Sequence, residues 1–216
     1  MYKFADLKLI DAIDTCVNTR GLVALNPETT NEVLATPDKE IGHVRLTLYR
    51  KNKNHVIKAH ENGISALALN PDGRLLATAS DKGTLIRLLN TESGNPLAEF
   101  RRGSDKADIF SLTFDTKSVW LAVASDKSTI HVFAVTKDIH EALGNADFEN
   151  NGNGAEEVKD EPKNSKKFGV LSNIFSKSSY FNSIVSHMQF KLKENAVENK
   201  AFCAFSEDSS TLIVVN

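Results

Sequence analysis

The sequence predicts an all-β fold of the β-propeller type, built from small repeated sheets. Three observations predict it: an ungapped repeat with a 45-residue period, three short apolar runs in each copy, and turn residues between the runs. Residues 64–87 recur as residues 109–132, and Ala-Ser-Asp-Lys occupies positions 79–82 and then 124–127. A β-sandwich of similar short strands is the alternative, but a sandwich does not require a fixed period.

Each copy is a strand–turn–strand–turn–strand unit. Pro71-Asp72-Gly73 separates the first two runs of one copy, and Asp81-Lys82-Gly83 separates its second and third runs. A weaker copy lies upstream at residues 22–48, and another begins at Cys203 and stops at Asn216 before its third strand. We therefore expect four blades with the last one incomplete, at about residues 1–54, 55–100, 101–135 and 186–216.

Residues 136–185 interrupt the blades, and a loop of this length is usually functional or disordered. Residues 146–167 are rich in Asn and Gly and then densely charged, which predicts disorder. Residues 163–193 contain six lysines and no acidic residue. Seven apolar side chains there share one half of a helical wheel: Val170, Leu171, Ile174, Phe175, Phe181, Ile184 and Val185. This pattern is typical of a membrane-interface segment, and a loop packed against the propeller side is the alternative.

The composition argues against several function classes. With 26 Lys+Arg against 28 Asp+Glu and a net charge of −2, the chain is not a broadly basic nucleic-acid binder. Cys16 and Cys203 form neither a disulfide framework nor a CxxC metal motif, and no apolar run is long enough to span a bilayer. We expect a cytoplasmic protein without metal or cofactor. No Ser/His/Asp order or Gly-rich phosphate loop indicates an enzyme.

The connection between the second and third blades contains Phe100-Arg101-Arg102-Gly103. Neighbouring side chains of an extended strand point to opposite sides, so Arg101 and Arg102 should face two different places. Gly103 allows the backbone to turn afterwards. Because the guanidinium fork suits phosphate, the two arginines are candidates for two separate phosphate sites. A solvated pair of surface arginines is the alternative.

This motif and its surroundings resemble the PROPPIN (WIPI-type) group of WD-repeat propellers, whose hallmark is Phe/Leu-Arg-Arg-Gly. The resemblance also covers Lys58-Ala59-His60-Glu61, residues 77–87 and residues 125–133, in the order and spacing of that family. It implies a seven-bladed propeller, of which this chain would contain the fourth to seventh blades. We therefore expect a partial propeller that lacks the first blades and the C-terminal closure.

The resemblance implies binding of phosphatidylinositol 3-phosphate and the 3,5-bisphosphate in two rim pockets. The first pocket would be formed by Arg101, His60, Ser80, Lys82, Thr84 and Arg87. The second would be formed by Arg102, Ser125, Ser128, Thr129 and His131. It also assigns residues 168–185 to a loop that enters the bilayer. The implied function is that of an adaptor in autophagy, recruited peripherally to phagophore and endosomal membranes, with a lipid-transfer partner that contacts mainly the absent blades.

Structural roles are the alternatives for these residues. His60 occupies the place where WD repeats carry a structural histidine, and Arg87 suits an outward strand position. Turn or strand formation is an alternative role for four others: Ser80, Ser125, Thr84 and Thr129. His131 stands where the surrounding pattern calls for an apolar residue. For the whole chain, the alternative is a WD-repeat scaffold that binds only proteins.

Overall fold

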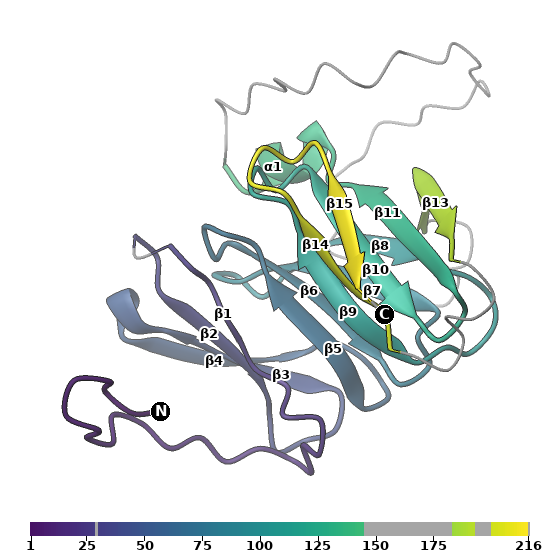
Figure 1. Cartoon of the computed structure of the whole chain (residues 1–216). Coiled ribbons are helices and arrows are strands. Elements are labelled where there is room, and N and C mark those ends of the chain that lie inside the picture. The colour runs from purple at the N-terminus through teal and green to yellow at the C-terminus, as the bar shows by residue number, and fades with distance from the viewer. Residues whose placement is uncertain (29, 145–182, 193–199, 216) are drawn as a thin grey trace.

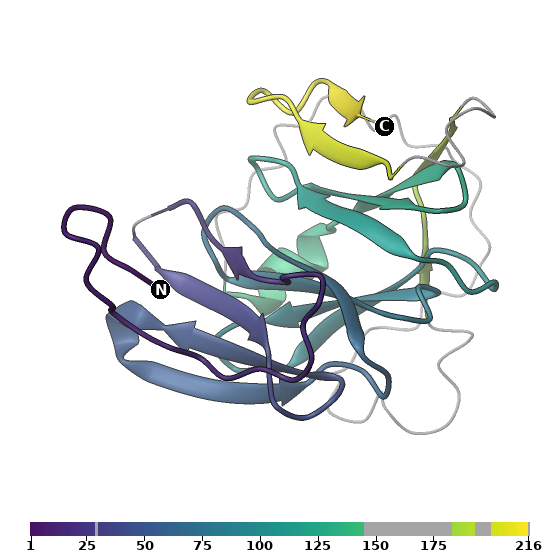
Figure 2. The ribbon, with the colours of Figure 1, turned by 60° about the horizontal axis from the view of Figure 1, so that its bottom comes forward.

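The computed structural model describes residues 1–28, 30–144, 183–192 and 200–215. Its strands form four sheets that stand side by side as successive layers, from the purple N-terminal sheet to the yellow C-terminal hairpin (Figures 1 and 2). The innermost strands of neighbouring sheets lie next to one another. The predicted all-β, propeller-type fold is therefore confirmed.

The first two sheets precede the arginine pair or contain its first member. The first sheet consists of β1 (Ala24–Leu25), β2 (Val33–Pro37), β3 (His43–Leu48) and β4 (Lys53–Lys58), with the 3₁₀ turn η1 (Tyr49–Lys51) between its last two strands. The second sheet consists of β5 (Ile64–Leu69), β6 (Leu75–Ser80), β7 (Leu85–Asn90) and β8 (Pro96–Arg101). A fifth strand, β12 (Ile184–Val185), pairs with β8 in parallel, whereas all other pairs are antiparallel.

The last two sheets follow the arginine pair. The third sheet consists of β9 (Ile109–Phe114), β10 (Trp120–Ser125), β11 (Thr129–Ala134) and β13 (Met188–Lys191). The fourth is the hairpin of β14 (Phe202–Phe205) and β15 (Leu212–Val215). The short helix α1 (Lys137–Ala142) follows β11. No helix among the described residues is long and apolar enough to span a bilayer.

A similar turn joins the first two strands of each sheet. A side-chain oxygen before the turn accepts a hydrogen bond from a backbone N–H after it, at Asn26, Asn70, Asp115 and Ser206. Three of these turns contain a residue with positive φ three positions later, at Gly73, Ser118 and Ser209. Such polar side chains satisfy the buried backbone groups that a tight turn leaves without a ladder partner.

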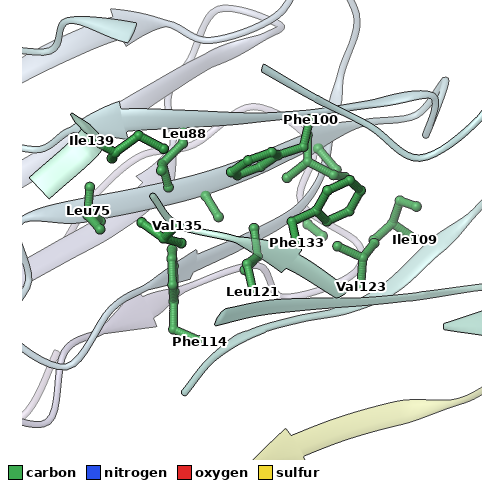
Figure 3. Close-up of a cluster of buried hydrophobic side chains, with 14 residues drawn as sticks. Leu75, Leu88, Phe100, Ile109, Phe114, Leu121, Val123, Phe133, Val135 and Ile139 are labelled. Atoms are coloured by element: carbon green, nitrogen blue, oxygen red, sulfur yellow. The ribbon is translucent and has the colours of Figure 1, made fainter. Parts of the chain in front are cut away.

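Hydrophobic clusters fill the space between successive sheets. The cluster between the second and third sheets contains Phe100 and Phe133, whose ring centroids are 4.9 Å apart (Figure 3). Ile139 of α1 closes one end of this cluster. Because successive side chains of a strand point to opposite faces, each inner sheet contributes to two clusters. The layers are thereby held in a fixed relation around the motif at residues 100–103.

The structure corrects three of the expected boundaries. β13 pairs with β11, so residues 188–191 belong to the third sheet and the fourth blade does not begin at residue 186. The first sheet extends to Lys58 rather than residue 54, and the second includes Arg101. Both β12 and β13 add to an outer strand, where they satisfy edge hydrogen-bonding groups that the apolar pattern does not reveal.

The segment 136–185 is not disordered throughout. It begins with α1, and its end forms β12, so Ile184 and Val185 have extended backbone rather than the helical conformation expected for the membrane-facing wheel. Both side chains are exposed, Ile184 at 37% and Val185 at 71%. The other members of the wheel lie outside the described residues, as does the stretch expected to be disordered: Val170, Leu171, Ile174, Phe175, Phe181 and residues 146–167.

Candidate functional site

The motif lies at the end of β8, and the alternation of its side chains separates the two arginines. Phe100 points toward the third sheet and stacks on Phe133 of β11. Glu99 and Arg101 lie on the opposite face, where Glu99 bonds to Arg87 of β7. Arg102 lies on the other side, where its charge interacts with His131 and Asp126 of the third sheet. The two guanidiniums therefore occupy different intersheet spaces, as the extended chain predicts.

On the face of Arg101, a row of polar side chains crosses the second sheet. Thr78 pairs with Arg87, and Arg87 pairs with Glu99, in the register of β6, β7 and β8. Arg87 donates from Nε to Glu99 Oε2 at 3.2 Å and from Nη1 to the carbonyl of Ala59 at 2.6 Å. Cross-strand neighbours on one face of a sheet interact directly. This row brings Arg87 to the same side as Arg101.

Three of the residues assigned to the first pocket take part in main-chain contacts. Ser80 is buried, and its carbonyl accepts hydrogen bonds from Ser65 Oγ and from the N–H of Gly83. Thr84 is half-buried, and its carbonyl accepts the N–H of Arg102 at 2.9 Å. Lys82 is exposed, and its carbonyl accepts the N–H of Ala107 at 3.0 Å. The turn that carries Lys82 and Thr84 therefore contacts the segment of Arg102 directly.

His60 is 5% exposed, and its Nε2 lies 3.0 Å from Thr78 Oγ1. Burial, and to a smaller extent the positive charge of Arg87, lowers the pKa of His60 to about 4, while an interaction with the backbone of Thr78 opposes the shift. The imidazole is therefore neutral at pH 7. This environment favours the structural alternative for His60 over a charged contact with a phosphate.

This pKa shift predicts a pH-dependent stability. As the pH falls from 6.5 to about 4, the unfolded chain binds a proton at His60 and the folded chain does not. The free energy of unfolding therefore decreases by about 3 kcal/mol as the pH falls through that range. Above pH 6.5 both states are neutral and the effect is absent. Urea unfolding at pH 7 and pH 4.5 should show a larger loss for the wild type than for His60→Gln. Equal losses in the two proteins would contradict the prediction, because the other titrating groups are common to both.

On the other face, Arg102 is only 8% exposed and is held by main-chain carbonyls. Its Nε donates to the carbonyl of Gly83 at 2.9 Å, and its Nη2 donates to the carbonyl of Asp105. Burial lowers the pKa of Arg102, and the carboxylates of Asp126 and Asp105 oppose this shift. A guanidinium remains charged in this setting. The site thus holds a buried cation whose bonded partners are neutral.

The residues expected around Arg102 lie on the neighbouring strands of the third sheet. His131 is buried, its Nδ1 lies 3.3 Å from Ser186 Oγ, and burial together with Arg102 lowers its pKa. Ser125 Oγ accepts the N–H of Lys127 at 3.3 Å, and Thr129 Oγ1 donates to the carbonyl of Lys127 at 3.3 Å. Turn formation therefore engages both hydroxyls.

Ser128 occupies the left-handed position of the β10–β11 turn, with φ of 50°. Its carbonyl accepts the N–H of Leu192, which follows β13. Gly83 has the equivalent place in the β6–β7 turn, with φ of 62°. A Cβ at Gly83 would lie 1.9 Å from the carbonyl oxygen of Ala107, so only glycine permits this approach of the turn to the segment after the arginine pair.

Several contacts of the site were not identified from the sequence. Ser183, just before β12, donates to Glu99 Oε1 at 3.0 Å and accepts from Arg101 Nη2 at 3.2 Å. On the other face, the hydroxyl of Ser186 contacts Nδ1 of His131. Both serines lie at the C-terminal end of the insert, far in sequence from the arginines. Only Glu99 has a local signal in the sequence, because it stands two positions before Arg101 on the same face of a strand.

The arrangement is suited to binding anions rather than to covalent chemistry. Each face contains a guanidinium, whose N–H groups suit phosphate oxygens, and the second face also contains the imidazole of His131. Arg102 is covered by the segment at residues 103–105, whose side chains at 104 and 105 are exposed.

Comparisons with known proteins agree with the sequence resemblance. The sequence profile of the PROPPIN family matches residues 1–147. Autophagy-related protein 18e of Arabidopsis thaliana is 41% identical over 139 residues, covering 64% of this chain and 37% of that relative. SVP1-like protein 2 of Emericella nidulans is 36% identical over 167 residues, covering 77% of this chain and 49% of that relative. The chain thus spans less than half the length of these curated relatives.

Solved structures show the same fold. The crystal structure of Kluyvelomyces marxianus Hsv2 superposes with a TM-score of 0.68 and 27% identity, covering 99% of this chain and 54% of that one. The KlAtg21 chain in its complex with the coiled coil of AgAtg16 gives a TM-score of 0.51 and 29% identity, covering 62% and 45% of the two chains. The profile match covers more than half of the sequence, and the sheets of the matched region are those of a propeller. The chain therefore belongs to the PROPPIN family.

Proposed function

We propose that this chain binds phosphatidylinositol 3-phosphate and the 3,5-bisphosphate as a peripheral membrane adaptor in autophagy. The observation that carries the proposal is the placement of Arg101, the last residue of β8, and Arg102, the next residue, on opposite sides of the chain, with polar side chains near each. Two separate cationic sites at one strand end suit two headgroups of one membrane. Their combined binding exceeds that of either site through effective concentration.

The site residues support the two sides unequally. On the first side, Arg87 lies on the same face as Arg101 and bonds to Glu99, while the buried His60 is hydrogen-bonded to Thr78. On the second side, His131 lies beside Arg102. The contacts of Ser80, Ser125, Ser128 and Thr129 are those of turns, and we propose that they shape the pockets around the arginines. The proposed chemistry needs no metal, cofactor or covalent step.

Flotation of the 216-residue chain with liposomes tests the proposal. Vesicles that contain phosphatidylinositol 3-phosphate should carry the protein to the top of a gradient, while vesicles with an equal amount of phosphatidylinositol 4-phosphate should not. The second lipid matches the first in charge and differs only in the position of the phosphate. Equal flotation with both vesicles, or none with either, would sink the lipid hypothesis and favour a scaffold that binds only proteins.

We also propose that the insert contributes an apolar anchor to the membrane. Peripheral binding generally needs more than one signal, and the acid-free stretch of residues 163–193 has apolar and basic side chains. Phe175→Asp with Phe181→Asp should weaken flotation several-fold and leave binding of soluble inositol 1,3-bisphosphate unchanged. Calorimetry with the soluble headgroup provides that comparison, and an equal loss in both assays would show that the two aromatics support the fold instead.

Protein partners belong to the same proposal. The KlAtg21 structure contains a coiled coil of AgAtg16, and several relatives bear the name autophagy-related protein. We propose an autophagy protein as the partner of this chain, including the lipid-transfer protein that the family resemblance implies. Pull-down with membranes present and absent would distinguish a partner that needs the lipid-bound state from one that does not.

A further inference from the structure

Glu99 is the carboxylate of the first arginine face, and its presence beside a proposed anion site needs an explanation. Its two oxygens contact different parts of the molecule. Oε2 accepts from Arg87 Nε at 3.2 Å, and Oε1 accepts from Ser183 Oγ at 3.0 Å. The hydroxyl of Ser183 in turn accepts from Arg101 Nη2 at 3.2 Å. One carboxylate is thus connected to both arginines of this face.

The ion pair between Arg87 and Glu99 is largely shielded from solvent. The side chains are 17% and 14% exposed, and the guanidinium is also fixed by the carbonyl of Ala59. Such a shielded pair is weakly screened by salt and is strongly perturbed when one partner is removed. A carboxylate here therefore fixes the orientation of Arg87 far more firmly than an exposed pair would.

The second oxygen links the face to a distant part of the chain. Ser183 directly precedes β12, in which Ile184 pairs with Phe100 and Val185 pairs with Arg101. The two-residue ladder is short, and both of its side chains are exposed, so little apolar burial holds it in place. The hydroxyl of Ser183 is thus a side-chain attachment of this ladder to β8, and Glu99 is its acceptor.

We propose that Glu99 is a positioning residue for the first anion site. It orients Arg87 directly and Arg101 through Ser183, and the same hydroxyl fastens β12 to β8. This inference rests on the proposed function, since it concerns the binding of a phosphorylated headgroup at these arginines. A carboxylate beside an anion site opposes binding by its charge, so its contribution is geometric and must exceed that repulsion.

The test compares two substitutions of one residue in the 216-residue chain. Glu99→Gln keeps one oxygen that can accept from Arg87, and its amide nitrogen can donate to Ser183 Oγ in place of the present bond from that hydroxyl. It removes the charge, so the affinity for inositol 1,3-bisphosphate should be equal to or higher than that of the wild type. Glu99→Ala removes both contacts, and the affinity should fall about tenfold, the amount expected for loss of one charge-assisted hydrogen bond. Titration calorimetry measures both.

A second measurement follows β12 without any ligand. Hydrogen exchange at Ile184 and Val185 should accelerate in Glu99→Ala and in Ser183→Ala, because each loses the side-chain attachment of the ladder. The matched control is Glu92→Gln, which makes the same charge change in an exposed pair with Lys51 beyond the opposite end of β7. It should change neither the affinity nor the exchange.

The outcomes separate this inference from the proposed function. If the wild type binds and Glu99→Ala binds equally well or more tightly, the positioning role is overturned while headgroup binding stands. If Glu99→Gln loses as much affinity as Glu99→Ala, the geometry of the contacts does not explain the effect, and the role is likewise overturned. If the wild type itself binds no headgroup, the proposed function fails and this inference fails with it.

Discussion

Replacing Arg101 and Arg102 together by Thr is expected to lower the affinity for liposomes containing phosphatidylinositol 3-phosphate by about a hundredfold or more. Each guanidinium would make at least one charge-assisted hydrogen bond to a headgroup, which contributes about 1.5–3 kcal/mol. The two losses also remove the gain from binding two headgroups on one surface. Flotation and surface plasmon resonance with matched vesicles measure the change.

The chain offers a closely matched control for this variant. Arg50 and Lys51 are also consecutive basic residues, in the 3₁₀ turn η1 at the far end of β3 and β4 from His60. Replacing both by Thr changes the net charge by the same amount and should leave flotation nearly unchanged. If the control loses as much binding as the variant, general charge attraction rather than the arginine motif holds the protein on the membrane.

The single substitutions should differ because the two arginines are held differently. Arg102 is buried and bonded to the carbonyls of Gly83 and Asp105, so Arg102→Thr leaves those acceptors without a donor and lowers stability. Arg101 bonds to a serine hydroxyl beside β12 among its contacts, and it is less deeply buried than Arg102. The melting temperature should therefore fall in Arg102→Thr more than in Arg101→Thr.

The blades could be predicted because their turns are local. The polar residue before the turn and the left-handed residue within it recur at Asn70 and Gly73 and again at Asp115 and Ser118, which places the strands on either side. The strands β12 and β13 could not be placed in this way. Their partners, β8 and β11, are more than 50 residues away in sequence, and a pairing over that distance has no signal in the local pattern.

The helical wheel of the insert failed at Ile184 and Val185 for a related reason. Periodicity describes what a segment prefers when it is alone, whereas the edge of β8 offers hydrogen bonds to an extended segment. Similarly, α1 was missed because its six residues are too few to show a period. Tertiary pairing, rather than intrinsic propensity, determined both segments.

In the candidate site, strand alternation alone predicts the divergence of the two arginines. It did not predict that main-chain carbonyls hold Arg102, since any residue type can supply a carbonyl. The place of Thr84 in the pocket of Arg101 is implied by the family resemblance and stays a prediction, and the carbonyl of Thr84 accepts the N–H of Arg102. Contacts through the backbone depend on how closely two turns approach, and here the glycine at position 83 allows that approach.

The other large effect is expected at Phe100, which lies between Glu99 and Arg101 in sequence but on the opposite face. Its side chain is fully buried and stacks on Phe133 (Figure 3). The ring of Phe133 in turn lies nearly parallel to the imidazole of His131. Phe100→Ala removes the Phe100 ring from the cluster between the second and third sheets. It should lower the free energy of unfolding by about 3–5 kcal/mol, a large part of the stability of a typical domain.

Urea unfolding followed by the fluorescence of Trp120, the single tryptophan, measures this loss. Phe190→Ala is the matched control, because Phe190 is 46% exposed on the edge strand β13 and should cost less than about 1 kcal/mol. If Phe100→Ala lowers the free energy of unfolding no more than Phe190→Ala does, the stack does not hold the sheets together. The stack also supports His131, which lies on the side of Arg102. Phe100→Ala should therefore lose headgroup binding on the second face, whereas Phe100→Leu, which retains most of the side-chain volume, should keep it.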